Sequence, residues 1–196
     1  MTKLKICGLF RAADIDYVNE AKPDYIGFVF AKSRRQVNFA LARALRERLN
    51  PGIMPVGVFV DAPQTEIIQL YRENIIGAAQ LHGGESRAYI ESLKKKGIPI
   101  IKAVRVEGEA DILAHMDSPA DYLLLDNGAG GTGTMFDWNF LSACTRPYFL
   151  AGGVNFSNIS DALALHPYCV DISSGAERDG VKDGEKIRLL AEAVRD

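Results

Sequence analysis

Short apolar segments alternate with amphipathic segments along the entire chain. The apolar segments are rich in Ile, Val, Leu and Phe and end at polar or glycine residues, which is typical of buried strands. The predicted strands are Leu4–Cys7, Tyr25–Val29, Pro55–Val60, Ala78–Leu81, Ile98–Val104, Tyr122–Leu125, Tyr148–Leu150 and Val170–Ile172. Most are followed by a turn and then by apolar residues at helical spacing. These returning segments are Arg11–Glu20, Phe39–Leu49, Gln64–Glu73, Ser86–Lys96, Ala110–His115, Trp138–Ala143, Ser157–Leu165 and Glu185–Val194.

Eight such units indicate a closed (β/α)8 barrel. Dividing 196 residues among eight units leaves about 24 residues for each, which is near the lower size limit of this fold. Near-continuous apolar strands between helices indicate a parallel sheet that is covered on both faces. An open doubly wound sheet has a similar local pattern but usually fewer strands. No linker divides the chain, so we predict a single-domain α/β TIM barrel of near-minimal size over residues 1–196.

Composition adds limits on partners and compartment. The formal net charge is −2 and the sequence has no basic block, which argues against nucleic acid as the main partner. Apolar runs such as Met54–Val60 are too short to span a bilayer, and the first residues lack the apolar core of a signal peptide. Cys7, Cys144 and Cys169 suit neither a disulfide framework nor a zinc site, so we expect a reducing cytoplasm.

Two neighbouring strand ends near the C-terminus share a design that suits a phosphate group. One strand runs into Ala151-Gly152-Gly153 and the next into Ser173-Ser174-Gly175. Glycine lets backbone N–H groups approach a ligand closely, and a helix N-terminus adds positive partial charge. One such turn alone would be an ordinary glycine turn, but the pair matches the phosphate site after strands seven and eight of (β/α)8 barrels. The predicted phosphate-binding residues are Gly152, Gly153, Ser173, Ser174 and Gly175.

The active site of such a barrel lies where the strands end and the following loops begin. The charged or reactive side chains at these positions are Cys7, Arg34, Arg35, Asp61, His82, Arg105, Asp126 and Asp171. Because side chains alternate along a strand, Leu124 and Asp126 face the barrel axis if Leu123 and Leu125 face the helices. The same rule groups Lys5 with Cys7, Gln80 with His82, and Asp171 with Ser173.

Cys7 and Asp126 approach a ligand from different sides, and a thiol and a carboxyl suit proton transfer in opposite senses. A cysteine whose pKa is lowered by Lys5 and by backbone dipoles acts as a base. An aspartic acid whose pKa is raised by burial supplies a proton. The alternatives are a small core residue for Cys7 and a turn or helix cap for Asp126.

The remaining candidates divide into ligand contacts and residues without a role in chemistry. His82 is a ligand contact or a turn residue, and a guanidinium from Arg34 or Arg35 suits a carboxylate. We expect Asp61 to cap a helix. No partner suggests itself for Arg105, and we assign no chemical role to Cys144, Cys169, His115 and His166. The glycine-rich segment 126–133 suits a lid; the His, Cys and carboxylate positions give no compact metal set.

Several motifs, in order along the chain, resemble those of the phosphoribosylanthranilate isomerase family. They are Lys5-Ile6-Cys7-Gly8, Gln80-Leu81-His82-Gly83, Leu125-Asp126 with Gly130-Gly131-Thr132-Gly133, Leu150-Ala151-Gly152-Gly153, and Val170–Glu177 with Gly180–Asp183. The resemblance covers nearly the full chain. It implies a (β/α)8 barrel without a cofactor that catalyses the Amadori rearrangement of N-(5'-phosphoribosyl)anthranilate to 1-(2-carboxyphenylamino)-1-deoxyribulose 5-phosphate in tryptophan biosynthesis.

The resemblance also implies site roles. Asp126 is expected to protonate the furanose ring oxygen as the general acid, and Cys7 to remove the proton from sugar C2 as the general base. Arg35 is expected on the anthranilate carboxylate and Asp171 near the sugar hydroxyls or the amine. The substrate-binding residues that we predict are Arg35, Gln80, His82 and Asp171.

This sequence departs from the family pattern at two positions. Arg34 replaces a proline in the loop Ser33–Val37, so either arginine can make the carboxylate contact. Asp179 replaces a proline before Gly180, and we expect a more mobile loop there. Two other functions stay open, namely another sugar-phosphate barrel enzyme and a non-catalytic sugar-phosphate-binding barrel. The sequence also leaves open a monomer or a homodimer, and a substrate range that includes the related histidine-pathway aminoaldose.

Overall fold

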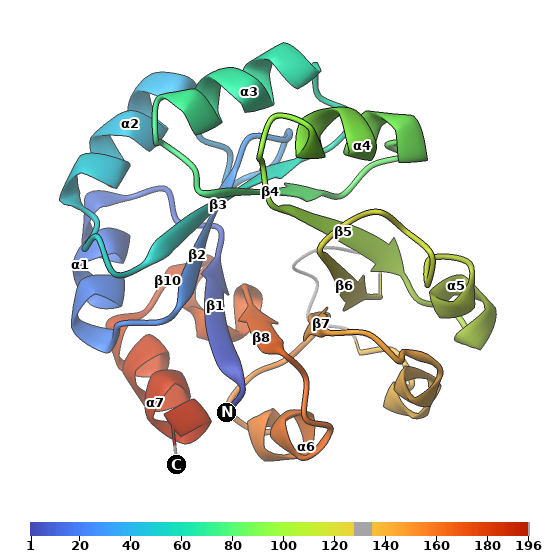
Figure 1. Ribbon diagram of the computed structural model, residues 1–196. Helices are drawn as coiled ribbons and strands as arrows, with labels where there is room; N and C mark the ends of the chain where they lie inside the picture. Colours follow the sequence, from blue (N-terminus) through green and yellow to red (C-terminus); the bar gives the residue numbers. More distant parts are fainter. Residues whose placement is uncertain (128–134, 196) are drawn as a thin grey trace.

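Eight parallel strands close into a barrel in a computed structural model that describes residues 1–127 and 135–195. The strands follow one another around the ring in chain order, and β8 pairs with β1 (Figure 1). Their bounds are β1 Lys3–Cys7, β2 Tyr25–Val29, β3 Met54–Phe59, β4 Ala78–Leu81, β5 Ile100–Arg105, β6 Tyr122–Asp126, β7 Tyr148–Leu150 and β8 Cys169–Ile172. The predicted (β/α)8 barrel is therefore confirmed.

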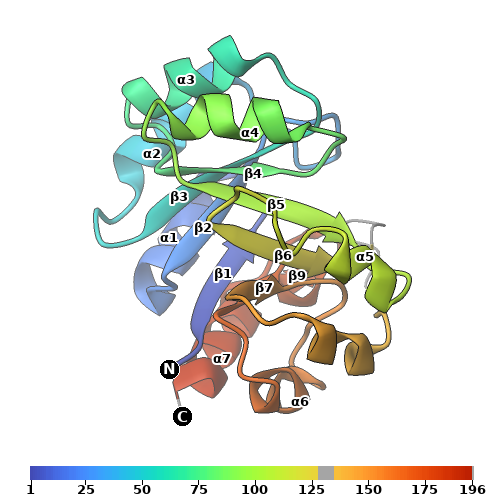
Figure 2. The same cartoon turned by 45° about the vertical axis from the view of Figure 1, so that its right-hand side comes forward.

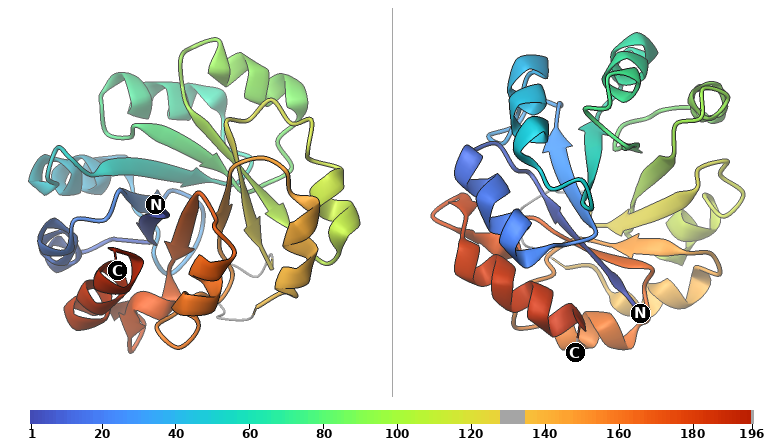
Figure 3. Two further views of the ribbon diagram at one scale, coloured as in Figure 1. Left: turned by 60° about the horizontal axis from the view of Figure 1, so that its bottom comes forward. Right: turned by 60° about the vertical axis from the view of Figure 1, so that its left-hand side comes forward.

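Helices surround the barrel on its outside, as the side views show (Figures 2 and 3). They are α1 Ala12–Ala21, α2 Phe39–Arg48, α3 Gln64–Arg72, α4 Arg87–Lys94, α5 Glu109–Leu113, α6 Ile159–Ala164 and α7 Gly184–Arg195. The return after β6 is a six-residue 3-10 helix, η1 (Trp138–Ala143), and a second, η2 (Ser174–Ala176), follows β8. Helix α7 packs against α1, so both chain ends lie on the same side (Figure 3). Among the described residues, no helix has the length and apolar character needed to cross a membrane.

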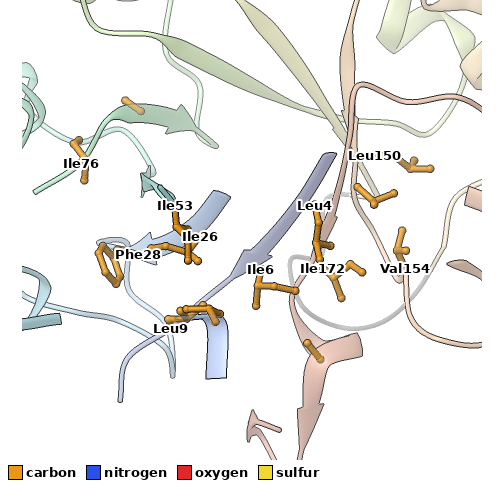
Figure 4. Packing of buried hydrophobic residues seen from close by; sticks show 14 of the residues in the cluster. Leu4, Ile6, Leu9, Ile26, Phe28, Ile53, Ile76, Leu150, Val154 and Ile172 are labelled. Atoms are coloured by element: carbon orange, nitrogen blue, oxygen red, sulfur yellow. The ribbon is translucent and has the colours of Figure 1, made fainter. Parts of the chain in front are cut away.

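Alternation along the strands separates two apolar layers. Leu4 and Ile6 on β1 belong to the larger core (Figure 4). Leu123 and Leu125 on β6 belong to the same core, which also contains the buried faces of the helices. Leu124 belongs instead to a second cluster inside the barrel. The predicted orientation of β6 is therefore confirmed, and Asp126, two residues after Leu124, lies on the cavity wall.

An aromatic layer fills the amino-terminal end of the barrel. The hydroxyls of Tyr25 and Tyr122 lie 3.0 and 3.1 Å from the hydroxyl of Tyr168, and the ring of Phe149 packs against all three tyrosines. Burying these rings stabilises the closed ring of strands, and their hydroxyls remain hydrogen-bonded to one another. The opposite, carboxyl-terminal end carries the polar side chains.

A two-stranded hairpin that the apolar pattern did not predict follows β8. Its strands are β9 (Glu177–Arg178) and β10 (Val181–Lys182), which pair antiparallel. The two turn residues, Asp179 and Gly180, both have positive φ, at 51° and 82°. This conformation is that of a type I′ turn, which Asp-Gly favours and which proline cannot adopt.

Phe149→Ala tests whether the interior layer supports the barrel. The Phe149 side chain is fully buried, so we expect the free energy of unfolding to fall by about 3–5 kcal/mol. The same substitution at Phe156, which is 58% exposed, should change it by less than about 0.5 kcal/mol. Urea unfolding followed by circular dichroism measures both, and equal small effects would show that the interior layer contributes little.

Candidate active site

A cavity of about 360 Å³ opens at the carboxyl-terminal end of the barrel. Its wall is formed by the ends of the strands and the loops that follow them, as expected for this fold. Of the residues predicted from the sequence, those on the wall are Cys7, Arg35, Gln80, His82, Asp126, Gly152, Gly153, Asp171, Ser173 and Ser174. These residues come from six separate segments of the chain and meet in one place.

Cys7 stands at the end of β1, beside a buried ion pair. Lys5 is fully buried on the same face of β1, and its Nζ lies 2.8 Å from Asp171 Oδ2 on β8. The two residues are directly opposite in the β1–β8 register. The close approach of β2 is possible because Gly27 faces Cys7, where a Cβ atom would lie 2.5 Å from Sγ. Cys7 is thus held between a glycine and a cation.

The pKa of Cys7 differs from the sequence prediction. Burial raises it above the ordinary value, and the nearby Lys5 ammonium only partly offsets this effect. The expectation of a lowered pKa is therefore wrong. The reason is that a thiolate loses hydration inside the barrel. The short separation of Lys5 and Cys7 in the sequence shows that a cation is near, but it does not show how deeply the thiol is buried. Lys5 remains the group that favours the thiolate form.

Asp126 ends β6 and faces His82, which follows β4. His82 Nε2 lies 3.7 Å from Asp126 Oδ2, and Nδ1 lies 3.3 Å from the side-chain amide of Gln80. The Gln80 N–H2 group can only donate, so Nδ1 of His82 is the acceptor and carries no proton. The proton of the neutral ring is then on Nε2, toward Asp126. Burial lowers the pKa of His82 more than the Asp126 carboxylate raises it, so the imidazole is neutral near pH 7. The acid candidate therefore faces a neutral hydrogen-bond donor.

Two buried acceptors on the wall have no hydrogen-bond partner within the described parts of the chain. They are Gln80 Oε1 and Asp171 Oδ1. Leaving such atoms unpaired costs about 1–3 kcal/mol each. Both therefore suit ligand N–H or O–H groups.

The two glycine turns lie side by side at the ends of β7 and β8. Gly152 and Gly153 both have positive φ, at 79° and 82°, and a Cβ on Gly152 would lie 2.8 Å from Asp126 Oδ1. Only glycine fits there without strain. Ser173 and Ser174 also line the cavity. Gly175 lies behind the wall, where it packs against the backbone of Val154 and Asn155.

The structure distinguishes the two arginines after β2. Arg35 is buried on the cavity wall, whereas the Arg34 side chain is 57% exposed and lies off it. Both bind Glu177, which accepts from Arg35 Nε at 2.6 Å and from Arg35 Nη2 at 2.9 Å. Glu177 also accepts from Lys182 Nζ at 2.6 Å.

Glu177 and Lys182 were not found from the sequence. Both belong to the hairpin β9–β10, and the Asp179-Gly180 pair between two short strands is the signal that could have revealed it. Seen as a hairpin, residues 177 and 182 are cross-strand partners, and a glutamate opposite a lysine suggests an ion pair.

A second buried ion pair, also missed, fixes the loop that carries His82. Lys102 Nζ on β5 lies 2.9 Å from Glu85 Oε2, and Glu85 accepts hydrogen bonds from the backbone N–H groups of Asp61 and Gly83.

The expected helix cap at Asp61 is wrong, because Pro63 is the residue at the start of α3. Asp61 Oδ1 instead accepts a hydrogen bond from the N–H of Gly84 at 2.8 Å. Asp61 thus holds the β4 loop.

The other candidates lie away from the cavity wall. Arg105 is exposed and pairs with Glu107 at 2.8 Å. Cys169 is a buried interior residue and Cys144 is half-buried. Neither His115 nor His166 lines the cavity. The proposed lid residues 128–133 fall outside the described residues, and among the described ones no cluster of three His, Cys, Asp or Glu side chains could hold a metal ion.

Comparison with known proteins identifies the family. Residues 4–193 match the family model described as N-(5'-phosphoribosyl)anthranilate (PRA) isomerase. This chain belongs to that family. A relative from Endomicrobium trichonymphae, named N-(5'-phosphoribosyl)anthranilate isomerase, is 46% identical over 100% of this chain and 99% of its own length.

Solved structures of the family share the fold. The phosphoribosyl anthranilate isomerase of Thermus thermophilus has a TM-score of 0.91 at 36% identity, covering 99% of this chain and 98% of that one. A family structure in complex with reduced 1-(o-carboxyphenylamino)-1-deoxyribulose 5-phosphate has a TM-score of 0.86 at 31% identity, covering 100% and 99%. The resemblance noted from the motifs is therefore confirmed.

The raised pKa of Cys7 predicts the pH dependence of its alkylation. Only the thiolate reacts, so the rate of carboxamidomethylation by iodoacetamide should rise with pH, with a midpoint above about 8.5, the value for an unperturbed thiol. Removing the Lys5 charge in Lys5→Met should move the midpoint higher still. Lys3→Met, on the same strand but at the aromatic end, should leave it unchanged. Peptide mapping separates Cys7 from the other cysteines, and an unmoved midpoint in Lys5→Met would contradict the role given to Lys5.

Proposed function

We propose that this chain isomerises N-(5'-phosphoribosyl)anthranilate to 1-(2-carboxyphenylamino)-1-deoxyribulose 5-phosphate, with Cys7 and Asp126 as the proton-transfer groups. The observation that carries the proposal is the meeting, in one cavity, of a cysteine from β1, an aspartate from β6 and the two glycine turns after β7 and β8. The family to which the chain belongs catalyses this reaction by name. The reaction is a step of tryptophan biosynthesis.

The first step opens the sugar ring. Asp126 gives its proton to the furanose ring oxygen as the bond from that oxygen to C1 breaks. The nitrogen lone pair forms the C1–N double bond, which leaves a protonated Schiff base. The neutral imidazole of His82, with its N–H toward Asp126, stabilises the carboxylate that this step produces.

The second step moves the double bond. The Cys7 thiolate takes the proton from C2, and the electron pair of that bond forms the C1–C2 double bond while the C1–N bond returns to single. The enolamine then becomes the ketone by moving a proton from oxygen to C1. Lys5 favours the thiolate that this step requires, because its ammonium is buried next to Cys7 and is fixed there by Asp171.

Two anion-binding regions position the substrate between these groups. The turns at Gly152–Gly153 and Ser173–Ser174 suit the phosphate, and Arg35 suits the anthranilate carboxylate because it is the arginine on the wall. Holding both ends fixes the reacting carbons, and such positioning supplies a large part of enzymatic rate acceleration. Gln80 Oε1 and Asp171 Oδ1 are suited to accept from the sugar hydroxyls or the amine.

Cys7→Ser and Asp126→Asn test the two proton-transfer assignments. Each should lower kcat by about 10²–10⁴-fold, the usual contribution of a general acid or base. Each should still bind the reduced product analogue with an affinity close to that of the unchanged protein. Cys144→Ser is the matched control and should keep full turnover. Near-normal kcat in both active-site variants would refute the assignments.

Loss of anthranilate fluorescence on conversion tests the function itself. The purified protein, mixed with freshly made phosphoribosylanthranilate, should consume the fluorescent substrate without an added metal or cofactor. Stable emission together with tight binding of the product analogue would instead identify a non-catalytic sugar-phosphate-binding barrel.

A further inference from the structure

A buried carboxylate holds three cations beside the cavity. The Glu177 side chain is 4% exposed and contacts Arg35 through both of its oxygens, Lys182 through Oε1 and Arg34 through Oε2. One negative charge therefore faces three positive charges, which leaves an excess of two. Burial raises the pKa of Glu177, but the hydrogen bonds from Arg35 and Lys182 outweigh it and the pKa is lowered. Glu177 is ionised at neutral pH.

The contacts with Glu177 fix the plane of the Arg35 guanidinium. Nε and Nη2 each donate to a different carboxylate oxygen, which is the bidentate geometry that restricts an arginine most. Of the five N–H groups of an arginine, these bonds use two, so three remain for a ligand. The Arg35 chain lies against Gly8, whose φ is +86° and where a Cβ atom would collide with Cδ. The contact with Gly8 and the two hydrogen bonds to Glu177 together restrict the Arg35 side chain to this position.

Lys182 ties this arginine to the phosphate turn. Its Nζ donates to Ser173 O at 3.0 Å as well as to Glu177, and its own carbonyl accepts from Arg11 Nη2 at 2.8 Å. Ser173 Oγ in turn donates to the carbonyl of Cys7 at 3.2 Å. The hairpin thus connects the loops that follow β1, β2 and β8. Arg35 and Ser173 lie in two of these loops, and Cys7 is the last strand residue before the third.

We propose that Glu177 is a positioning residue that aims Arg35 at the carboxylate of the substrate and thereby selects ligands that carry this group. The inference rests on the proposed function, since it uses the carboxylate that distinguishes the anthranilate ring from an unsubstituted aniline. Lys182 supports the same geometry by keeping the Glu177 carboxylate in place. The selectivity therefore comes from the hairpin β9–β10, outside the barrel strands.

Charge and geometry predict opposite results when Glu177 is replaced. If Glu177 acted only through its charge, Glu177→Gln would raise the positive potential of the cavity and strengthen binding of a carboxylate. If it positions Arg35, the same change replaces one of the two acceptor oxygens with an N–H2 donor, so the bidentate hold on the guanidinium is lost and carboxylate binding weakens. The sign of the effect therefore separates the two explanations.

The test compares two ligands by isothermal titration calorimetry. One is reduced 1-(o-carboxyphenylamino)-1-deoxyribulose 5-phosphate, and the other is the same molecule without the carboxyl group. Glu177→Gln should weaken binding of the first by about tenfold or more, the scale of a lost charge-assisted hydrogen bond, and of the second by less than about threefold. In an Arg35→Met background, Glu177→Gln should cause no further loss for either ligand. In turnover, KM should rise while kcat falls by less than about threefold.

Arg34→Met is the matched control, because Arg34 binds the same carboxylate from the exposed side. It should change the affinity for either ligand by less than about threefold. Glu177→Asp keeps the charge but shortens the reach, so it should show a smaller loss for the carboxylated ligand only. It decides the question if Glu177→Gln does not fold, as judged by thermal unfolding.

Three results would overturn the inference. Equal losses for both ligands would indicate a general structural role, and tighter binding of the carboxylated ligand would indicate an effect of charge alone. Equal affinity of the unchanged protein for the two ligands would show that Arg35 does not meet the carboxylate. Turnover of phosphoribosylanthranilate by the unchanged protein is measured separately, so each of these results can be told apart from failure of the proposed function.

Discussion

β1 and β8 pair in register from Lys3 opposite Cys169 to Ile6 opposite Ile172, and this pairing closes the barrel. It places Lys5 opposite Asp171, so that two charges from the two ends of the chain form one buried ion pair. Burying both charges costs hydration, and a buried pair of this kind is weak evidence for stability. The pair matters instead for the chemistry of the cavity, because it keeps the Lys5 ammonium beside Cys7 and leaves Asp171 Oδ1 as an acceptor at the cavity wall.

The interior of the barrel changes character along its axis. Tyrosines and Phe149 fill the amino-terminal end, whereas glutamine, aspartate and lysine occupy the inward positions nearer the carboxyl-terminal end. Three buried lysines, Lys5, Lys102 and Lys182, each pair with a carboxylate, and the partners of the last two, Glu85 and Glu177, bind groups of neighbouring loops. The apolar layer supplies the rigid frame, and the Lys102–Glu85 and Lys182–Glu177 pairs fix loops around the cavity.

The sequence determined much of this arrangement because its strongest signals are local. Strand ends fall where apolar runs stop, and alternation along β6 correctly oriented Leu124 and Asp126. The ion pairs could not be found in this way, since Arg35 and Glu177 are 142 positions apart and meet only through the closed barrel. The sequence predicts the wrong direction for the pKa shift of Cys7, because the effect of burial outweighs that of the nearby Lys5 charge. Burial depends on every element that surrounds the thiol. The Asp179-Gly180 pair is typical of a two-residue hairpin turn. The hairpin is not part of the strand–helix repeat, so the apolar pattern alone does not predict it.

A crystal structure of Cys7→Ser bound to reduced 1-(o-carboxyphenylamino)-1-deoxyribulose 5-phosphate would show directly whether the substrate lies between Cys7, Asp126 and the two glycine turns. We expect the phosphate at Gly153 and Ser174, the ring carboxylate at Arg35, and the sugar C1 and C2 between the substituted position and Asp126. A ligand with its phosphate away from both turns, or with its sugar carbons out of reach of either residue, would contradict it.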